Sequence, residues 1–359
     1  MSVLNVGTMN LSGRMNLPRL TQQEIDALDA IQGRVVFNTT VNAVQFYDGS
    51  GWVQPKTEAG IVAATGGDVT TSGGFTIHKY TNVGNSSFNV TQGGFVDLLV
   101  VGGGGGGGGV IGGGGGAGGF QYIPFYKIEP GNYSVEVGAG GTGGNGWNAS
   151  KQYGDKGGPS KFGTVWVDGG GGGSAHGGSG NGPFPFLCGG SGGGAAAQHY
   201  RAGLGASPTA GAFQGGANSF GYHGGGKGPG NPGGSCFSTY GGNAGAGGGG
   251  AKAKGADVRA PYQSSPGGDG YFNSITGTAV GYAGGGGGGN RSPGTAGNGG
   301  AGGGGNGTGS TSTAPNGGTN TGGGGGGGGY NGSSGSRIGG NGGPGICLLY
   351  TSPSPRDCQ

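Results

Sequence analysis

The sequence predicts a mainly β protein with polyglycine-II-type helices and almost no α-helix. The first observation is that 112 of the 359 residues are glycine, against roughly 7% in ordinary chains. The second is that glycine occurs in blocks, such as residues 102–109 and 322–329. The third is that short runs rich in apolar residues separate the blocks. A helix-interior glycine costs ~0.5–1 kcal/mol relative to alanine, which excludes a helical fold. The 17 prolines, without a Gly-X-Y repeat, exclude collagen.

The glycines also divide the chain into zones. Residues 1–101 hold 13 of them and residues 347–359 hold none, which leaves 99 in residues 102–346. We therefore expect a small N-terminal attachment or oligomerisation module at 1–58 and a strand-forming lead-in at 59–101. A glycine-rich domain with loops between its blocks follows at 102–346, and a separate tail at 347–359.

The N-terminal module carries the patterns of a short helix and a β-hairpin. Thr21 followed by Glu24 matches a capping box, and apolar residues at helical spacing predict a helix over 22–30. Residues 34–37 and 44–47 are apolar runs around a polar turn, which predicts a hairpin. A core of this size is marginal alone, so we expect the module to pack against copies of itself or against its neighbour.

Residues 17–53, LPRLTQQEIDALDAIQGRVVFNTTVNAVQFYDGSGWV, resemble a short repeat of tail-fibre and virion-appendage proteins of bacteriophages. The shared pattern is LPRLT, a helix, and G-x-V-x-F-N-x-x-x-N-x-x-Q-F-Y-D-G-x-x-W. In that family the segment is structural and often trimeric. The resemblance therefore implies a homotrimer through this module and other tail-fibre proteins as partners.

Three strands are predicted before the first long glycine block, at residues 75–80, 87–90 and 95–101. The third, FVDLLVV, is apolar on both faces, so we expect it inside a sheet. Later runs predict further short strands at residues 121–128, 133–137, 160–167 and 270–280.

The glycine blocks have two alternative structures. They can form extended helices with three residues per turn, which pack closely because no side chain separates them and which share backbone hydrogen bonds. They can also be flexible coil, because ordering costs about 1–2 kcal/mol per residue and more for glycine. We favour order, because buried backbone groups need partners and because well-formed strands and recurring aromatics punctuate the blocks.

The order of elements over residues 66–346 resembles the glycine-rich domain of phage tail adhesins and of some marine bacterial surface proteins. The segments that carry the resemblance include LLVVGGGGGGGG, IEPGNYSVEVGAGGTGGNG and GGPGI. Some adhesins of this type fold as stacked polyglycine helices whose distal loops contact the host receptor. The family usually continues into a Val/Ile strand after Gly345 and Ile346, and this sequence departs from it there.

The residues that follow, CLLYTSPSPRDCQ (347–359), resemble the in-frame translation of a transposase-type sequencing adapter. The resemblance implies a gene assembled from environmental reads, with Ile346 as the last genuine residue. Leu348, Leu349 and Tyr350 are therefore left out of the fold prediction.

Without that tail, the cysteines are Cys188 and Cys236. Neither has a His or Cys partner at close spacing, which excludes a zinc site. A disulfide between them is one alternative, if the protein works outside cells, and free thiols are the other. The sequence leaves both open.

Several kinds of chemistry are not expected. The net charge of +3 is scattered, which argues against a nucleic-acid partner, and no apolar run nears the ~18 residues of a membrane helix, which argues against membrane insertion. Gly226 and Lys227 precede a glycine rather than Ser or Thr, so they form no P-loop. His78 lies in a predicted strand, where we expect it to be a residue on one face, and the other three histidines lie in loops without the nearby acids that would orient them for catalysis or metal binding: His176, His199 and His223. We predict no enzyme activity, no cofactor and no metal.

What remains is a recognition surface between the blocks. Aromatic residues among Ser, Gly and Asn give contact area at low entropic cost. The predicted receptor-binding residues are Phe184, Phe186, His199, Tyr200, Arg201, Phe220, Tyr222, His223, Tyr240 and Tyr262. Tyr330 follows a glycine block in the same way.

Together with the two resemblances, these residues favour an adhesin at the tip of a phage tail fibre. It would be an extracellular part of the virion and would bind a host cell-surface protein or glycan through the loops between blocks. The alternative is a glycine-rich structural or filament protein of the bacterial surface, without a specific receptor, which would assemble into open polymers.

Overall fold

The computed structural model describes most of the chain as two compact units, Met1–Glu58 and Ala59–Gln359, each considered by itself. The described residues are 17–29, 31–54, 62–72, 75–146, 151–176, 189–196, 230–236, 243–309, 312–332 and 337–351. Within these residues the fold is mainly β with one short helix, as the glycine content predicts.

The N-terminal unit is a small sheet with one helix, α1 (Gln22–Asp26). The predicted capping box is present, because the Glu24 N–H donates to Thr21 Oγ1 and the Thr21 N–H to Glu24 Oε2. The helix is shorter than the expected 22–30, since the Leu28 N–H bonds three residues back to Ile25. The sheet has the order β1 (Arg19–Leu20), β2 (Val35–Asn38), β3 (Ala43–Tyr47) and β4 (Trp52–Val53), so the predicted hairpin is β2–β3.

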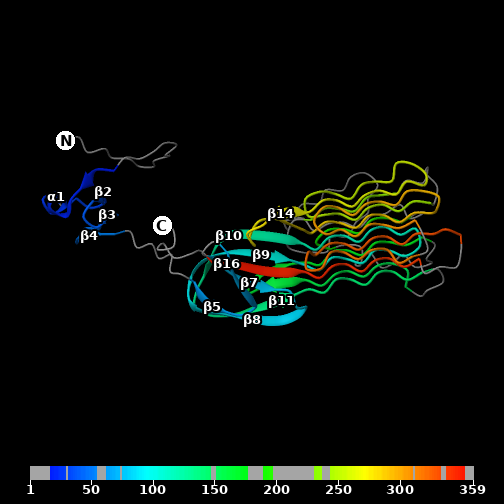
Figure 1. Ribbon diagram of the computed structural model, residues 1–359, viewed down its shortest axis with the longest axis horizontal. Coiled ribbons are helices and arrows are strands. Elements are labelled where there is room, and N and C mark those ends of the chain that lie inside the picture. Colours follow the sequence, from blue (N-terminus) through cyan, green and yellow to red (C-terminus); the bar gives the residue numbers. More distant parts are fainter. Residues whose placement is uncertain are drawn as a thin grey trace. The chain divides into compact units, whose positions relative to one another are not determined.

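The second unit begins with two facing five-stranded sheets (Figure 1). One has the order β10 (Phe120–Ile128), β9 (Gly94–Val101), β16 (Ile346–Thr351), β7 (Phe75–Tyr80) and β6 (Asp68–Ser72). The other has the order β13 (Val165–Val167), β12 (Ser160–Phe162), β11 (Gly131–Val137), β8 (Gly84–Gln92) and β5 (Ala63–Thr65). A separate pair consists of β14 (Tyr271–Asn273) and β15 (Val280–Tyr282).

Strand β9 lies inside its sheet and is buried on both faces, as its apolar sequence predicts. Leu98 belongs to the core between the two sheets, together with Phe88 and Phe162 of the facing sheet. Leu99 belongs to a second cluster on the opposite face, which includes Tyr282 of β15. Because successive side chains of a strand point to opposite faces, β9 contributes to both clusters. Strands β5 and β6 were not expected from the sequence, because β6 is exposed throughout and has no apolar alternation.

The C-terminal strand corrects one expectation. The sequence alone predicts residues 347–351 to lie outside the fold, yet they form β16 with Ile346, and β16 pairs antiparallel with both β7 and β9. Cys347 and Leu349 lie in the core between the sheets and Leu348 in the cluster on the other face, all three with no exposed surface. The reason is physical: CLLYT is apolar on both faces and satisfies the backbone groups of two neighbouring strands. Residues 352–359 lie outside the described residues, and the origin of the tail stays a prediction.

The glycine blocks are ordered and run side by side away from the sandwich (Figure 1). The N–H groups of residues 102–110 donate in rotation to the segments 112–119, 151–159 and 337–345, so every third residue contacts the same neighbour. Toward the first neighbour the pairs are Gly102–Gly119, Gly105–Gly116 and Gly108–Gly113, with N···O distances of 2.8–2.9 Å. A repeat of three residues is that of the polyproline II helix.

The carbonyl groups of the same central segment accept from three other segments, 138–146, 168–176 and 322–329. The segment is thus enclosed by six neighbours and bonded to each through its backbone. No side chain fits in this arrangement. A Cβ added at Gly104, Gly105 or Gly106 would meet a carbonyl oxygen well inside 3.0 Å, each time on a different neighbour. The centre of the bundle is therefore main chain alone.

We expect Gly105→Ala to destabilise the second unit by about 3 kcal/mol or more, because the methyl group must displace the main chain at residue 171. Gly51→Ala, in the N-terminal unit, is the control and should leave the stability of the second unit unchanged, since nothing lies within 4 Å of its Cβ position. Thermal unfolding followed by circular dichroism, with amide hydrogen exchange of the glycines, measures both. Equal stability of the two variants would contradict a close-packed bundle.

The role of β16 predicts that Leu349→Ala lowers the free energy of unfolding by about 2–5 kcal/mol through the cavity it leaves. Val69→Ala, at a side chain in β6 that is 53% exposed, should change it by less than about 0.5 kcal/mol. Denaturant titration of the two variants gives the comparison. A C-terminal segment that does not belong to the core would give the same small effect in both.

Candidate functional site

The end of the bundle farthest from the sandwich, here called the distal end, is where the central segment 102–110 turns back into 112–119. Val110 and Ile111 form this turn with φ of +45° and +49°, which is strained for β-branched residues. Both are buried, and Tyr330 packs against them. Val110 and Ile111 thus cover the distal end of the polyglycine core with apolar side chains, and the Tyr330 ring is held against them.

Backbone and side-chain hydrogen bonds join the turns that meet at the distal end. The Tyr262 carbonyl accepts from the Thr295 N–H at 2.9 Å and from Asn290 Nδ2 at 3.2 Å. Asn290 is fully buried, and its own carbonyl accepts from the Tyr330 N–H at 2.9 Å. Segments that are far apart in the sequence therefore form one surface.

Tyr262 stands out on this surface. Its side chain is 42% exposed, and its backbone has φ of +57°, an uncommon conformation for a non-glycine residue. Residues held in such conformations by their surroundings are concentrated at functional sites. Tyr262 is the one predicted receptor-binding residue within the described part of the chain, and it presents an aromatic side chain to solvent at the distal end.

Two arginines lie over the ring of Tyr330. The guanidinium carbon of Arg337 is 4.5 Å from the ring centroid and that of Arg291 is 5.3 Å from it, both within the range of cation–π attraction. Arg291 is exposed and makes no ion pair with any carboxylate among the described residues. Both guanidinium groups therefore lie within cation–π range of the same ring at the distal end.

A cavity of about 410 Å³, in the size range of small-ligand sites, is lined by residues on either side of Tyr262 in the sequence, including Ala260 and Gln263. Its polar lining includes Lys254, Asp257, Arg259 and Gln263, and the Lys254 ammonium is 3.2 Å from the Asp257 carboxylate. Ser265 also lines it. The Ser265 Oγ is buried and has no hydrogen-bond partner among the described residues.

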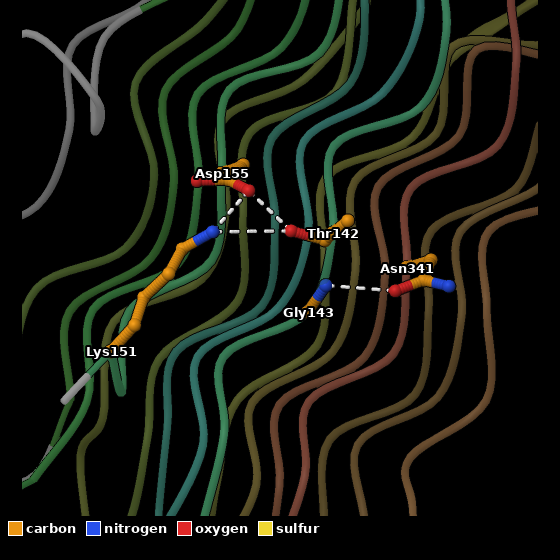
Figure 2. Close-up of polar contacts among 5 residues, drawn as sticks. All are labelled: Thr142, Gly143, Lys151, Asp155 and Asn341. Carbon is orange, nitrogen blue, oxygen red and sulfur yellow. Dashed lines mark hydrogen bonds and ion pairs between the residues drawn. The ribbon is translucent and has the colours of Figure 1, made fainter. Parts of the chain in front are cut away.

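On the perimeter of the bundle, side chains replace glycine where they can point outward (Figure 2). Lys151 and Thr142 both contact the Asp155 carboxylate. The Gly143 N–H donates to Asn341 Oδ1 at 2.8 Å. These contacts tie neighbouring segments together laterally and neutralise the charge of Asp155.

The other predicted receptor-binding residues lie outside the described residues: Phe184, Phe186, His199, Tyr200, Arg201, Phe220, Tyr222, His223 and Tyr240. Sequence reasoning did not single out Arg259, Arg291 or Arg337. A signal for two of them exists, because Arg291 and Arg337 are the only charged residues in residues 270–346 and each lies near the end of a glycine block.

Cys236 is a free thiol, and Cys188 lies outside the described residues. The Cys236 Sγ donates to the carbonyl oxygens of Ala195 and Ala244 at 3.3 and 3.4 Å, inside a small cluster that includes Val258. Burial is the main cause that raises the pKa of Cys236 to about 12. A thiol of this kind is inert at neutral pH.

His78 is one of the two histidines within the described residues. His78 is buried in the sandwich, where its Nδ1 is 2.8 Å from the Gly66 carbonyl and its ring packs edge-on against Phe88. Within the described ranges, no group of three His, Cys, Asp or Glu side chains is placed to hold a metal ion. The same ranges contain no helix that is long and apolar enough to cross a bilayer.

A comparison with protein-family models matches residues 80–352 to the family described as Glycine-rich domain. The match covers more than half of the chain and spans both the strands of the sandwich and the segments of the bundle. A comparison with curated proteins gave no match.

The buried thiol predicts a pH dependence. The unfolded Cys236 ionises near its usual pKa of 9.0, whereas the folded one keeps its proton to about pH 12. The stability that the protein loses when Cys236 ionises is therefore fully present below pH 9, and it is lost as the pH rises from 9 to 12. In this window the free energy of unfolding of the wild type should fall more steeply than that of Cys236→Ala, by up to about 1.4 kcal/mol per pH unit. Parallel curves would show that Cys236 is solvated.

Proposed function

The chain belongs to the glycine-rich domain family, and we propose that it is an adhesin whose distal end binds a receptor on a cell surface. In this proposal the bundle acts as a rigid stalk, the turns at its distal end form the binding surface, and no reaction is catalysed. We further propose that the protein is the tip of a phage tail fibre and therefore an extracellular part of the virion.

The observation that carries the proposal is the convergence of separate turns at one end of a body held by its backbone. Residues 110–111, 262–263, 290–295 and 330 come from distant parts of the sequence and are fixed together by hydrogen bonds and packing. A surface that is ordered before it meets its partner loses little entropy on binding. This arrangement supports recognition by a preformed surface.

The chemistry of the distal end also supports a binding role. Tyr and Arg are the residues that most often dominate binding energy at interfaces, and the described distal turns present Tyr262, Tyr330, Arg291 and Arg337. Further aromatic residues occur in the sequence between the described bundle segments, at 177–188, 197–229 and 237–242.

The placement in a phage rests on the resemblance of residues 17–53 to tail-fibre repeats. A four-stranded sheet with a small core around Ile25 and Val36 is too small to be very stable alone, which favours assembly of this unit into a homotrimer. Open polymers in sedimentation and electron microscopy would instead favour a structural filament protein.

The test is binding of the purified full-length chain to a panel of bacterial strains, measured by flow cytometry. On a strain that binds the wild type, Tyr262→Ala should weaken binding about ten-fold, or ~1.4 kcal/mol, because it removes an exposed aromatic from the contact surface. Phe272→Ala is the matched control, since Phe272 is 63% exposed in β14 at the sandwich end of the unit.

Replacement of residues 197–229, which lie between the bundle segments 189–196 and 230–236 in the sequence, by a glycine–serine linker should abolish cell binding if these residues contribute as expected. Full binding by both the Tyr262 variant and this replacement, with unchanged thermal stability, would overturn the assignment of the distal end as the binding surface.

A further inference from the structure

The cavity of about 410 Å³ is formed by one stretch of chain that folds back on itself. Its lining comes from the residues before and after the turn at Tyr262, here called the two arms. The Gln263 N–H donates to the Ala260 carbonyl at 3.4 Å, and the Ala256 N–H donates to the Pro266 carbonyl at 3.0 Å. The two arms are therefore bonded to each other near the turn and again farther from it.

The bundle holds both arms in place. On the first arm, the Val258 N–H donates to the Ser235 carbonyl at 2.9 Å. On the second arm, the Ser265 N–H donates to the Gly245 carbonyl at 3.2 Å, and the Ser265 carbonyl accepts from the Gly288 N–H at 3.0 Å. Because neighbouring segments fix its walls, the cavity is formed before a ligand enters, which lowers the entropic cost of binding.

The charged residues that line the cavity leave one positive charge unbalanced. Lys254 and Asp257 neutralise each other in an ion pair with an N···O distance of 3.2 Å. Arg259 also lines the cavity, is exposed, and makes no ion pair with a carboxylate among the described residues. Its guanidinium can therefore turn toward a ligand in the cavity without breaking an ion pair, and its paired N–H donors match a carboxylate.

Uncharged polar groups complete the lining. Ser265 is only 5% exposed, and its main-chain groups are both bonded, but its Oγ has no hydrogen-bond partner among the described residues. This hydroxyl and the side-chain amide of Gln263 can each donate and accept a hydrogen bond, as the hydroxyl groups of a sugar require.

The apolar part of the lining is small. It consists of Ala256, Ala260 and Pro266, and no aromatic or large aliphatic side chain is among the lining residues. A lining of this kind offers contact to the C–H groups of a sugar ring, but it does not favour the bulky apolar side chains of a peptide.

We propose that the cavity binds a sugar acid, with the carboxylate on Arg259 and ring hydroxyls on Ser265 and Gln263. One carboxylate balances the one unpaired positive charge of the lining. A phosphate monoester fits less well, because its charge of about −1.5 to −2 at pH 7 would exceed that of Arg259 and would be repelled by Asp257. The further assignment of the sugar acid to a cell-surface polysaccharide rests on the proposed function.

The test is a titration of the full chain with glucuronate, glucose and glucose 6-phosphate at low salt, followed in two-dimensional amide NMR spectra. We expect glucuronate to bind at least about ten-fold more tightly than glucose, because it alone of the two supplies a carboxylate for a charge-assisted hydrogen bond. The amide signals of residues 254–266 should shift. Equal affinity for glucuronate and glucose, tightest binding of glucose 6-phosphate, or shifts only outside these residues would overturn the proposal.

Arg259→Gln should weaken glucuronate binding at least about ten-fold and leave glucose binding unchanged. Lys79→Gln is the matched control, since it removes the same charge from an exposed residue of β7 in the sandwich and should bind glucuronate as the wild type does. Thermal unfolding should be the same in both variants. Wild-type affinity for glucuronate in Arg259→Gln would overturn the role of Arg259.

Ser265→Ala tests the buried hydroxyl. It should weaken glucuronate and glucose binding equally, by about five-fold, the size expected for one neutral hydrogen bond. It should not lower the thermal stability of the free chain, because the hydroxyl has no partner to lose among the described residues. Wild-type affinity for both sugars would remove Ser265 from the site.

Cell binding separates this inference from the proposed function. If glucuronate binds in the cavity but the wild type binds no strain, the sugar-acid site stands and the adhesin proposal fails. If the chain binds cells but free glucuronate neither binds nor competes, the site fails and the adhesin proposal stands. Competition by glucuronate that is lost in Arg259→Gln supports both.

Discussion

The close approach of main chains in the bundle is the constraint on which the rest of the molecule depends. Each N–H of the segment 102–110 is bonded to one of three neighbours, and three more neighbours bond to its carbonyl groups. This pattern leaves no space for a β-carbon at the centre. Residue identity there is fixed by steric exclusion rather than by hydrophobicity, and the cost of ordering glycine is offset by a backbone whose donors and acceptors are paired.

The sandwich, in contrast, is stabilised by buried apolar side chains. Its strands bury Phe88, Leu98, Phe162 and Leu349 between two sheets, and the opposite face of one sheet is covered by a second cluster around Leu99 and Leu348. Strands β9 and β10 continue directly into central segments of the bundle. The hydrophobic core therefore sets the register from which the glycine segments extend.

The same constraint determines where function can lie. Side chains are accommodated on the perimeter, as with Lys151, Asp155 and Asn341, and at the ends of the segments (Figure 2). Functional side chains are thus confined to surfaces whose positions are fixed by the hydrogen-bonded glycine segments. Arg291, Tyr330 and Arg337 lie at such an end, where sequence can vary without disturbing the centre.

The sequence by itself determined the class of fold and the strands around residues 75–101, because glycine content and side-chain alternation are local properties. It favoured ordered glycine blocks over flexible coil, and the backbone hydrogen bonds between segments decided for order. It also indicated Tyr262 as a surface aromatic. Only the tertiary structure decided that residues 347–351 complete a sheet, since that depends on an open position between β7 and β9. It also decided that Arg291 and Arg337 share one ring. A run of glycines carries no side-chain pattern that specifies which segments become neighbours. The three-dimensional packing of the backbone determines which segments lie side by side.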